Sequence, residues 1–134
     1  MAEPDHGDLC FGCGTANPFG LQLELERLDG GVTGRFLVKQ EHQGADGAAH
    51  PGVLTAALEE AMALTAGEVP QRRDITLRAS APVGTFVRVT GWVEVDGAVC
   101  AAASTERGEL LAEAASVDPG APSSSPSVPP ASPA

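Results

Sequence analysis

Short stretches of alternating hydrophobic and polar residues run through the first part of the chain, and this alternation is typical of strands with one buried face. Residues 21–26 alternate leucine with glutamine or glutamate and lead to the turn-forming residues 29–31. Residues 32–39 then resume the alternation. The two stretches therefore predict an antiparallel hairpin, which is followed by a loop over residues 41–49.

The segment after His50 has helical periodicity instead. Leu54, Leu58 and Ala61 recur at positions i, i+4 and i+7, and a proline directly after His50 suits the first helical turn. Gly67 ends the pattern. Because almost every residue of this segment is Ala, Leu, Val or Met, we expect a helix that is buried on most sides.

Alternation returns in the second half of the chain. Four stretches, residues 75–80, 86–95, 98–105 and 110–117, are separated by short breaks that contain glycine. They predict an antiparallel meander of about four strands. With the first hairpin and the helix, the order of elements is ββ-α-ββββ, which indicates an α+β domain whose antiparallel sheet wraps one central helix.

The composition limits how many domains the chain can form. It has 134 residues, of which 43% are hydrophobic, enough for one core and not for two. We assign residues 1–118 to one domain, with residues 1–20 as an N-terminal loop segment that carries the sequence CFGCG. Residues 119–134 are almost entirely Pro, Ser, Ala and Gly, so we expect a disordered tail there.

Few aromatic residues are available to fill the core. Tyrosine is absent and aromatic residues make up 4% of the chain. We therefore expect a core of Val, Leu and Ala, with Phe36, Phe86 and Trp92 as its bulky members. A core this small makes a monomer marginally stable, so we also expect copies of the chain to share a face, as a homodimer or a homotetramer.

Charge and hydropathy exclude two classes of partner. The formal net charge is −10 and the eight Lys and Arg residues are scattered, which argues against binding to nucleic acid. No stretch approaches the length of a membrane span, and the first residues lack the basic and apolar regions of an export signal. These features predict a cytoplasmic protein without membrane association.

Three cysteines raise the question of a disulfide or a metal. Cys10, Cys13 and Cys100 are an odd number in a chain without an export signal, so we expect reduced thiols. Cys10 and Cys13 have the spacing of half a zinc site, with His6 as a conceivable third ligand, but a structural zinc needs four. The ligand count predicts no metal and no cofactor, while a redox or metal module centred on Cys10 and Cys13 stays open as an alternative.

An acid interrupts the apolar helix. Glu59 follows Gly52 by seven residues, which returns it to within about 20° of the same face, roughly 10 Å further along the axis. Glu60 is one residue on and faces elsewhere, so the two acids do not form a working pair. A buried carboxylate among Ala, Leu and Met needs a partner, which makes Glu59 a candidate functional residue.

The start of the helix is a second candidate. Gly52 and Val53 offer backbone N–H groups at the positive end of the helix dipole, where they can polarise a carbonyl or hold an oxyanion. Gly52 permits the close approach of a ligand, and His50 lies beside it in the sequence.

These residues carry a resemblance to a known family. The run HPGVL over residues 50–54, the acid nine places after His50, the opening CFGCGTANPFGLQL and the later PVG before a strand resemble hotdog-fold acyl-CoA thioesterases. The match is closest to the subgroup typified by the phenylacetate-pathway enzymes, and it covers residues 9–117. It implies the hotdog fold, a helix inside a curled antiparallel sheet. It also implies hydrolysis of an acyl-CoA thioester between two subunits that pair edge to edge.

The resemblance implies roles for individual residues. The family's HGG turn falls on His50, Pro51 and Gly52. Its catalytic acid falls on Glu59, which would act as general base for water or as nucleophile. Pro51 departs from the family pattern because it has no N–H, so Gly52 or Val53 must polarise the carbonyl. The rival interpretation, which Pro51 favours, is a non-catalytic hotdog protein that binds acyl-CoA or another small ligand.

Helix geometry indicates that such a site is shared between subunits. One helix places Glu59 about 10 Å from its own start, too far for both to act on one carbonyl. Two antiparallel helices about a two-fold axis would bring Gly52 of one subunit near the acid of the other. Coenzyme A carries phosphates, for which Arg72 and Arg73 are candidate ligands, and Gln43 is a further candidate contact with the substrate.

Overall fold

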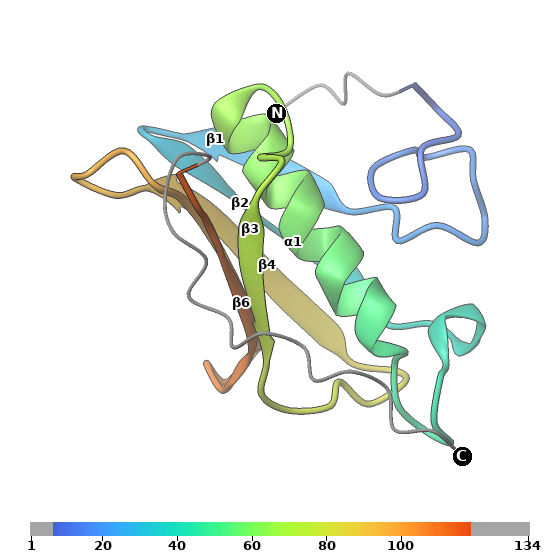
Figure 1. Ribbon diagram of the computed structural model, residues 1–134. Helices are drawn as coiled ribbons and strands as arrows, with labels where there is room; N and C mark the ends of the chain where they lie inside the picture. Colours follow the sequence, from blue (N-terminus) through green and yellow to red (C-terminus); the bar gives the residue numbers. More distant parts are fainter. Residues whose placement is uncertain (1–6, 119–134) are drawn as a thin grey trace, which may run out of the picture.

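The computed structural model describes residues 7–118, which form one antiparallel sheet curled around one helix (Figure 1). The helix is α1 (Pro51–Ala66), and a short 3-10 turn, η1 (Gln40–His42), lies in the predicted loop before it. The strands are β1 (Glu24–Leu28), β2 (Gly31–Leu37), β3 (Arg73–Leu77), β4 (Phe86–Val93), β5 (Val99–Thr105) and β6 (Leu110–Ser116). His6 and the predicted tail over residues 119–134 lie outside the described residues.

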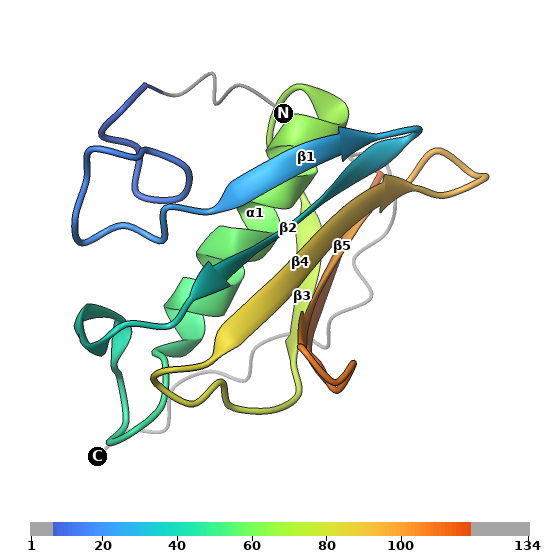
Figure 2. The ribbon, with the colours of Figure 1, turned by 180° about the vertical axis from the view of Figure 1, so that it is seen from behind.

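The order of the strands across the sheet is β1-β2-β4-β5-β6-β3, and all neighbours are antiparallel. Strands β4, β5 and β6 form a meander as predicted, but the prediction that β3 begins this meander is wrong. Strand β3 pairs with β6, with Ile75 opposite Ala114, and forms the far edge of the sheet. Because α1 crosses the sheet between β2 and β3, the chain re-enters at the other edge (Figures 1 and 2).

Helix α1 begins and ends where the sequence predicts. His50 is its N-cap and a proline occupies its first turn. Gly67 ends it in the left-handed conformation, with φ of 92°, and donates its N–H to the oxygen of Ala63. Among residues 7–118, no helix is long and apolar enough to cross a membrane. The residues of α1 that are buried are Val53, Leu54, Ala57, Leu58, Ala61, Met62, Ala63 and Leu64.

The aromatic part of the core is smaller than predicted. Phe36 is 2% exposed, but the expectation that Phe86 and Trp92 join it is wrong. Phe86 is 37% exposed and lies under the guanidinium of Arg35, 4.2 Å from the ring centre, while Trp92 is half-buried. Both residues alternate with the buried positions of β4, which places their side chains on the outer face of the sheet.

A glycine on β4 lets the helix pack closely on the sheet. A Cβ at Gly91 would lie 2.5 Å from Oγ1 of Thr65 and 2.8 Å from the backbone oxygen of Ala61. Both separations are too short for a methyl group, so the close approach of α1 depends on the absence of a side chain here.

The described part of the N-terminal loop segment, residues 7–20, lies beside α1 on the β1 side of the sheet (Figures 1 and 2). Strand β1 begins later than the strand predicted over residues 21–26, but Leu21 and Leu23 are buried as the alternation indicates. Their N–H groups bond to the backbone oxygens of Phe11, at 2.7 Å, and Gly12, at 2.9 Å. These bonds fasten the CFGCG segment to the core and place it against the helix.

Candidate active site

Glu59 lies midway along α1, on the flank that faces the edge strand β3. Arg73 of β3 donates to Oε2 of Glu59 from Nε, at 2.9 Å, and also from Nη2. The two side chains form an ion pair, and each is 29% exposed. Both of these hydrogen bonds from Arg73 are accepted by Oε2 of Glu59 and not by Oε1.

Glu60 points to the opposite flank of the helix. Its Oε1 accepts a hydrogen bond from the thiol of Cys10 at 3.5 Å, and its Oε2 is buried. One residue along a helix turns the side chain by about 100°, and here this step separates the two acids between the β3 side and the loop side. The prediction that Glu59 and Glu60 do not act as a pair agrees with this arrangement.

The first amides of α1 are engaged by His50. The Nδ1 atom of His50 accepts the N–H of Gly52 at 2.8 Å, and its backbone oxygen accepts the N–H of Val53 at 2.9 Å. Since Nδ1 of a neutral imidazole is the acceptor, its proton is on Nε2. Pro51 has no N–H, and the two amides expected to polarise a carbonyl, those of Gly52 and Val53, are both bonded to His50 in this arrangement. The side chain of Val53 is buried in the core.

A small cleft opens beside the helix start. It has a volume of about 240 Å³ and lies between the first turn of α1 and the end of β3. Leu54 and the half-exposed Leu77 give it an apolar wall. The residues that line it are Ala49, Pro51, Leu54, Leu77, Arg78, Ala79 and Ser80.

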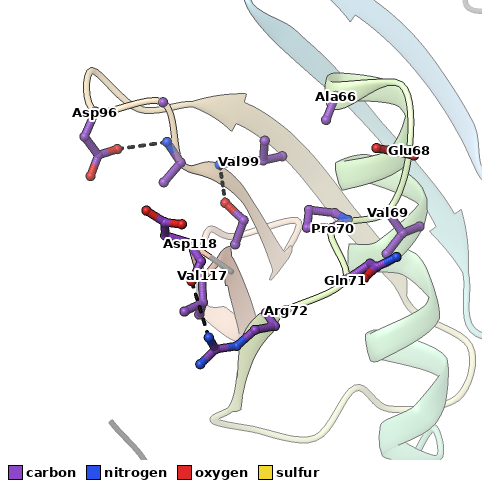
Figure 3. A pocket seen from close by; sticks show the side chains of 13 residues that line it. Ala66, Glu68, Val69, Pro70, Gln71, Arg72, Asp96, Val99, Val117 and Asp118 are labelled. Carbon is purple, nitrogen blue, oxygen red and sulfur yellow. Dashed lines mark hydrogen bonds between the residues drawn. The ribbon is translucent and has the colours of Figure 1, made fainter. Parts of the chain in front are cut away.

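The two arginines predicted to bind phosphate have separate surroundings. Arg73 forms an ion pair with Glu59, and its Nη1 donates to the backbone oxygen of Pro70 at 2.8 Å. Arg72 lines a larger cleft, of about 720 Å³, between the end of α1 and the ends of β5 and β6 (Figure 3). There its Nη1 donates to the backbone oxygen of Asp118 at 3.4 Å. The adjacent arginines therefore do not act as one basic cluster.

Gln43 is exposed in the loop before α1. Its Oε1 accepts the N–H of Gly47 at 3.0 Å, and its backbone pairs with Ala49, directly before His50. The loop thus brings Gln43 to the helix-start end of the molecule, at the opposite end of α1 from Arg72.

Within one chain the candidate residues fall into separate groups. His50 and Gly52 lie at the helix start, and Glu59 lies two turns further along with Arg73. Sequence reasoning missed the partnership of Glu59 with Arg73, because no local pattern shows that β3 passes beside the helix. It also missed that Glu60 meets the CFGCG segment.

Comparisons with known proteins agree with the architecture. No protein-family model matches the chain, and no curated protein matches it in sequence. The E. coli PaaI protein from the phenylacetic acid degradation operon matches in structure with a TM-score of 0.62 and 14% identity, over 71% of this chain and 80% of that one. A hypothetical thioesterase protein with coenzyme A from Streptococcus pneumoniae TIGR4 has a TM-score of 0.62 and 16% identity, over 69% and 83%. RHA08564, a thioesterase superfamily protein, has a TM-score of 0.68 and 22% identity, over 81% and 58%.

At sequence identities of 14 to 22%, these matches show a shared fold and do not show a shared activity. The strand order, the central helix and these matches agree with the architecture that the resemblance implied. The chain has the hotdog fold, which it shares with structures of thioesterases.

Proposed function

We propose that the protein hydrolyses an acyl-CoA thioester at a site shared between two copies of the chain. The observation that carries this proposal is Glu59, a half-buried carboxylate midway along the central helix and beside the edge of the sheet. The fold adds support, because structures that match include one with coenzyme A and one, smu.793 from Streptococcus mutans UA159, bound to acetyl CoA.

Glu59 acts through Oε1, as general base or as nucleophile. As base, it takes a proton from water while the water oxygen attacks the carbonyl carbon of the thioester. The tetrahedral intermediate then collapses, the C–S bond breaks, and the departing CoA thiolate takes up a proton. Arg73 holds Oε2 and balances the charge of the carboxylate, so Oε1 keeps one orientation toward the reactant.

The amide of Gly52 polarises the carbonyl. His50 accepts this N–H in the structure, so we infer that its imidazole is a stand-in that the carbonyl oxygen replaces when substrate binds. The exchange is nearly balanced, because one acceptor takes the place of another at the positive end of the helix dipole. Both His50 and Gly52 are exposed, which leaves room for the ring to turn away.

A second copy of the chain completes the site. Glu59 is seven residues from Gly52, about 10 Å along the same helix, so a single chain cannot apply both groups to one carbonyl. Strand β3 is the sheet edge next to Glu59, and its Leu77 is 48% exposed. We therefore place the contact at β3, where a two-fold axis brings Gly52 toward Glu59 of the partner subunit.

The other edge of the sheet is less suited to this contact. Strand β1 carries Glu24 and Glu26, which are both exposed, and a pair of identical β1 strands would bring these acids together. Charged residues on an edge strand oppose pairing with another strand.

The two clefts suggest where the acyl group and the CoA part of the substrate bind. The cleft of about 240 Å³ beside Pro51 has an apolar wall of Leu54 and Leu77 and suits a small acyl group. Arg72, at the rim of the larger cleft, is the candidate contact for a CoA phosphate, since Arg73 is committed to the acid. Gln43 is the candidate polar contact at the helix-start end.

The proposal is tested by a thiol-release assay over a panel of acyl-CoA thioesters. Replacing Glu59 with Gln removes the base at nearly constant shape and should lower kcat/KM by about 10²–10⁴. Glu109→Gln, at an exposed acid between β5 and β6, is the matched control and should hydrolyse at the wild-type rate. Equal rates of thiol release by wild type and Glu59→Gln would contradict the assignment.

A second candidate function is a binding protein without hydrolysis. Pro51 and the engagement of the Gly52 and Val53 amides by His50 favour it, because they leave no preformed oxyanion site. Calorimetry with CoA and a thioether analogue of acyl-CoA separates the two. Binding without any thiol release, in wild type and Glu59→Gln alike, would support the binding protein.

A further inference from the structure

Three groups that can bind a metal meet where the N-terminal loop segment packs on α1. The sulfur atoms of Cys10 and Cys13 and a carboxylate oxygen of Glu60 all lie within 4.8 Å of one another. The cysteines come from one tight turn, whereas Glu60 comes from the helix, fifty residues after Cys10. The expectation of no metal considered only Cys10, Cys13 and His6, and the helix brings a different third group, Glu60, beside both sulfurs.

Two glycines of the CFGCG segment let the loop close around these groups. A Cβ at Gly12 would collide with the side chain of Glu60, and a Cβ at Gly14 would collide with backbone atoms of Asp8 and Cys10. The N–H of Gly14 also bonds to the oxygen of Cys10 at 2.9 Å. A side chain at Gly12 would therefore push the carboxylate away from the two sulfurs.

The separations suit a tetrahedral metal ion. Zinc binds thiolate sulfur at about 2.3 Å and carboxylate oxygen at about 2.0–2.2 Å, which places neighbouring ligands roughly 3.5–3.8 Å apart. The distance from Sγ of Cys10 to Oε1 of Glu60 is 3.5 Å, and the limit for the group is 4.8 Å. Closure by about 1 Å at most would bring all three atoms to one ion.

Metal binding at this cluster requires both thiols to lose their protons. A divalent ion stabilises the two thiolates that result and balances the charge of the acid.

We propose that Cys10, Cys13 and Glu60 bind one zinc ion. Two thiolates and one carboxylate match the donor set of zinc, and soft sulfur ligands disfavour Mg²⁺ and Ca²⁺. Water fills the remaining tetrahedral position, so this site has three protein ligands and an open position, unlike the closed four-ligand site considered from the sequence. The ion fastens the loop to the face of α1 opposite Glu59 and takes no part in the proposed hydrolysis. Failure of one proposal therefore leaves the other unaffected.

Cobalt substitution tests this site directly. The full chain is purified under reducing conditions, stripped with a chelator and titrated with Co²⁺, which reports thiolate ligation by a charge-transfer band and tetrahedral geometry by its d–d bands. We expect one equivalent per chain, displacement by one equivalent of Zn²⁺, and release of the two thiol protons. Cys10→Ser, Cys13→Ser and Glu60→Gln should each weaken binding by about 100-fold or more.

Two variants serve as matched controls. Cys100→Ser removes the thiol of β5, and Glu59→Gln removes the neighbouring acid on the other flank of α1, so both should bind the metal as wild type does. Circular dichroism of the stripped variants separates loss of ligand from loss of fold. The proposal fails if reduced wild type takes up no cobalt, if the thiolate band persists without Cys10 or Cys13, or if mass spectrometry shows that these two cysteines form a disulfide under reducing conditions.

Discussion

Replacing His50 with alanine tests how the helix start is built. The imidazole of His50 accepts the N–H of Gly52 at 2.8 Å and is the N-cap of α1. Loss of an N-cap side chain costs about 1 kcal/mol, with a range of roughly 0.5–2. For a domain of this size, such a loss lowers Tm by about 4–6 °C.

The same change frees the amide proposed to polarise the carbonyl. If the imidazole must leave before substrate binds, its removal spares about 1 kcal/mol on binding, equivalent to a roughly fivefold lower KM. Thermal unfolding and thiol release, measured on the same preparations, should therefore move in opposite directions: stability falls and KM improves.

Asparagine at position 50 is the matched control. Asn is a good N-cap whose side-chain oxygen can accept the N–H of Gly52, so His50→Asn should keep the wild-type Tm. A tenfold or greater loss of kcat/KM in both His50→Ala and His50→Asn, with the fold intact, would refute the stand-in role. Such a loss would show instead that the imidazole of His50 contributes to hydrolysis directly. An unchanged Tm in His50→Ala would refute the cap.

Three further predictions concern the fold and its assembly. Gly91→Ala should destabilise the chain by about 1–3 kcal/mol in urea unfolding, because the added methyl meets Thr65 and Ala61 of α1. If the proposed dimer forms at β3, Leu77→Lys should convert it to a monomer in sedimentation and abolish the proposed hydrolysis, whereas Glu26→Lys on the opposite edge should leave the dimer intact. Burial raises the pKa of the Cys100 thiol above its ordinary value of 9.0, and Glu94 and Asp96 add smaller effects in the same direction. Cys100 therefore favours folding most below pH 9.0. This contribution to stability is lost as pH rises through the pKa of the folded state. The difference in unfolding free energy between wild type and Cys100→Ala should accordingly shrink as pH rises past 9.0, and a constant difference would contradict this.

Local periodicity was sufficient to predict most of the elements. Alternation in residues 32–38 places Val32 and Phe36 on the buried face of their strand. The i, i+4 spacing of Leu54 and Leu58 places both on the buried face of the helix. These patterns succeed because a strand turns its side chains by half a circle per residue and a helix by about 100°, so neighbours in sequence report which face is covered. The same rule placed Glu59 and Glu60 on different sides of α1.

Only the tertiary structure decided what each of these acids meets. Arg73 reaches Glu59 because β3 forms the far edge of the sheet beside α1, and Cys10 reaches Glu60 because the N-terminal loop segment packs on the other flank. Such pairings join residues far apart in the chain and depend on where the sheet closes and how closely α1 approaches it. No repeating pattern in the sequence carries that information, since the contacts arise from burial of one shared core and not from the conformation of any single segment.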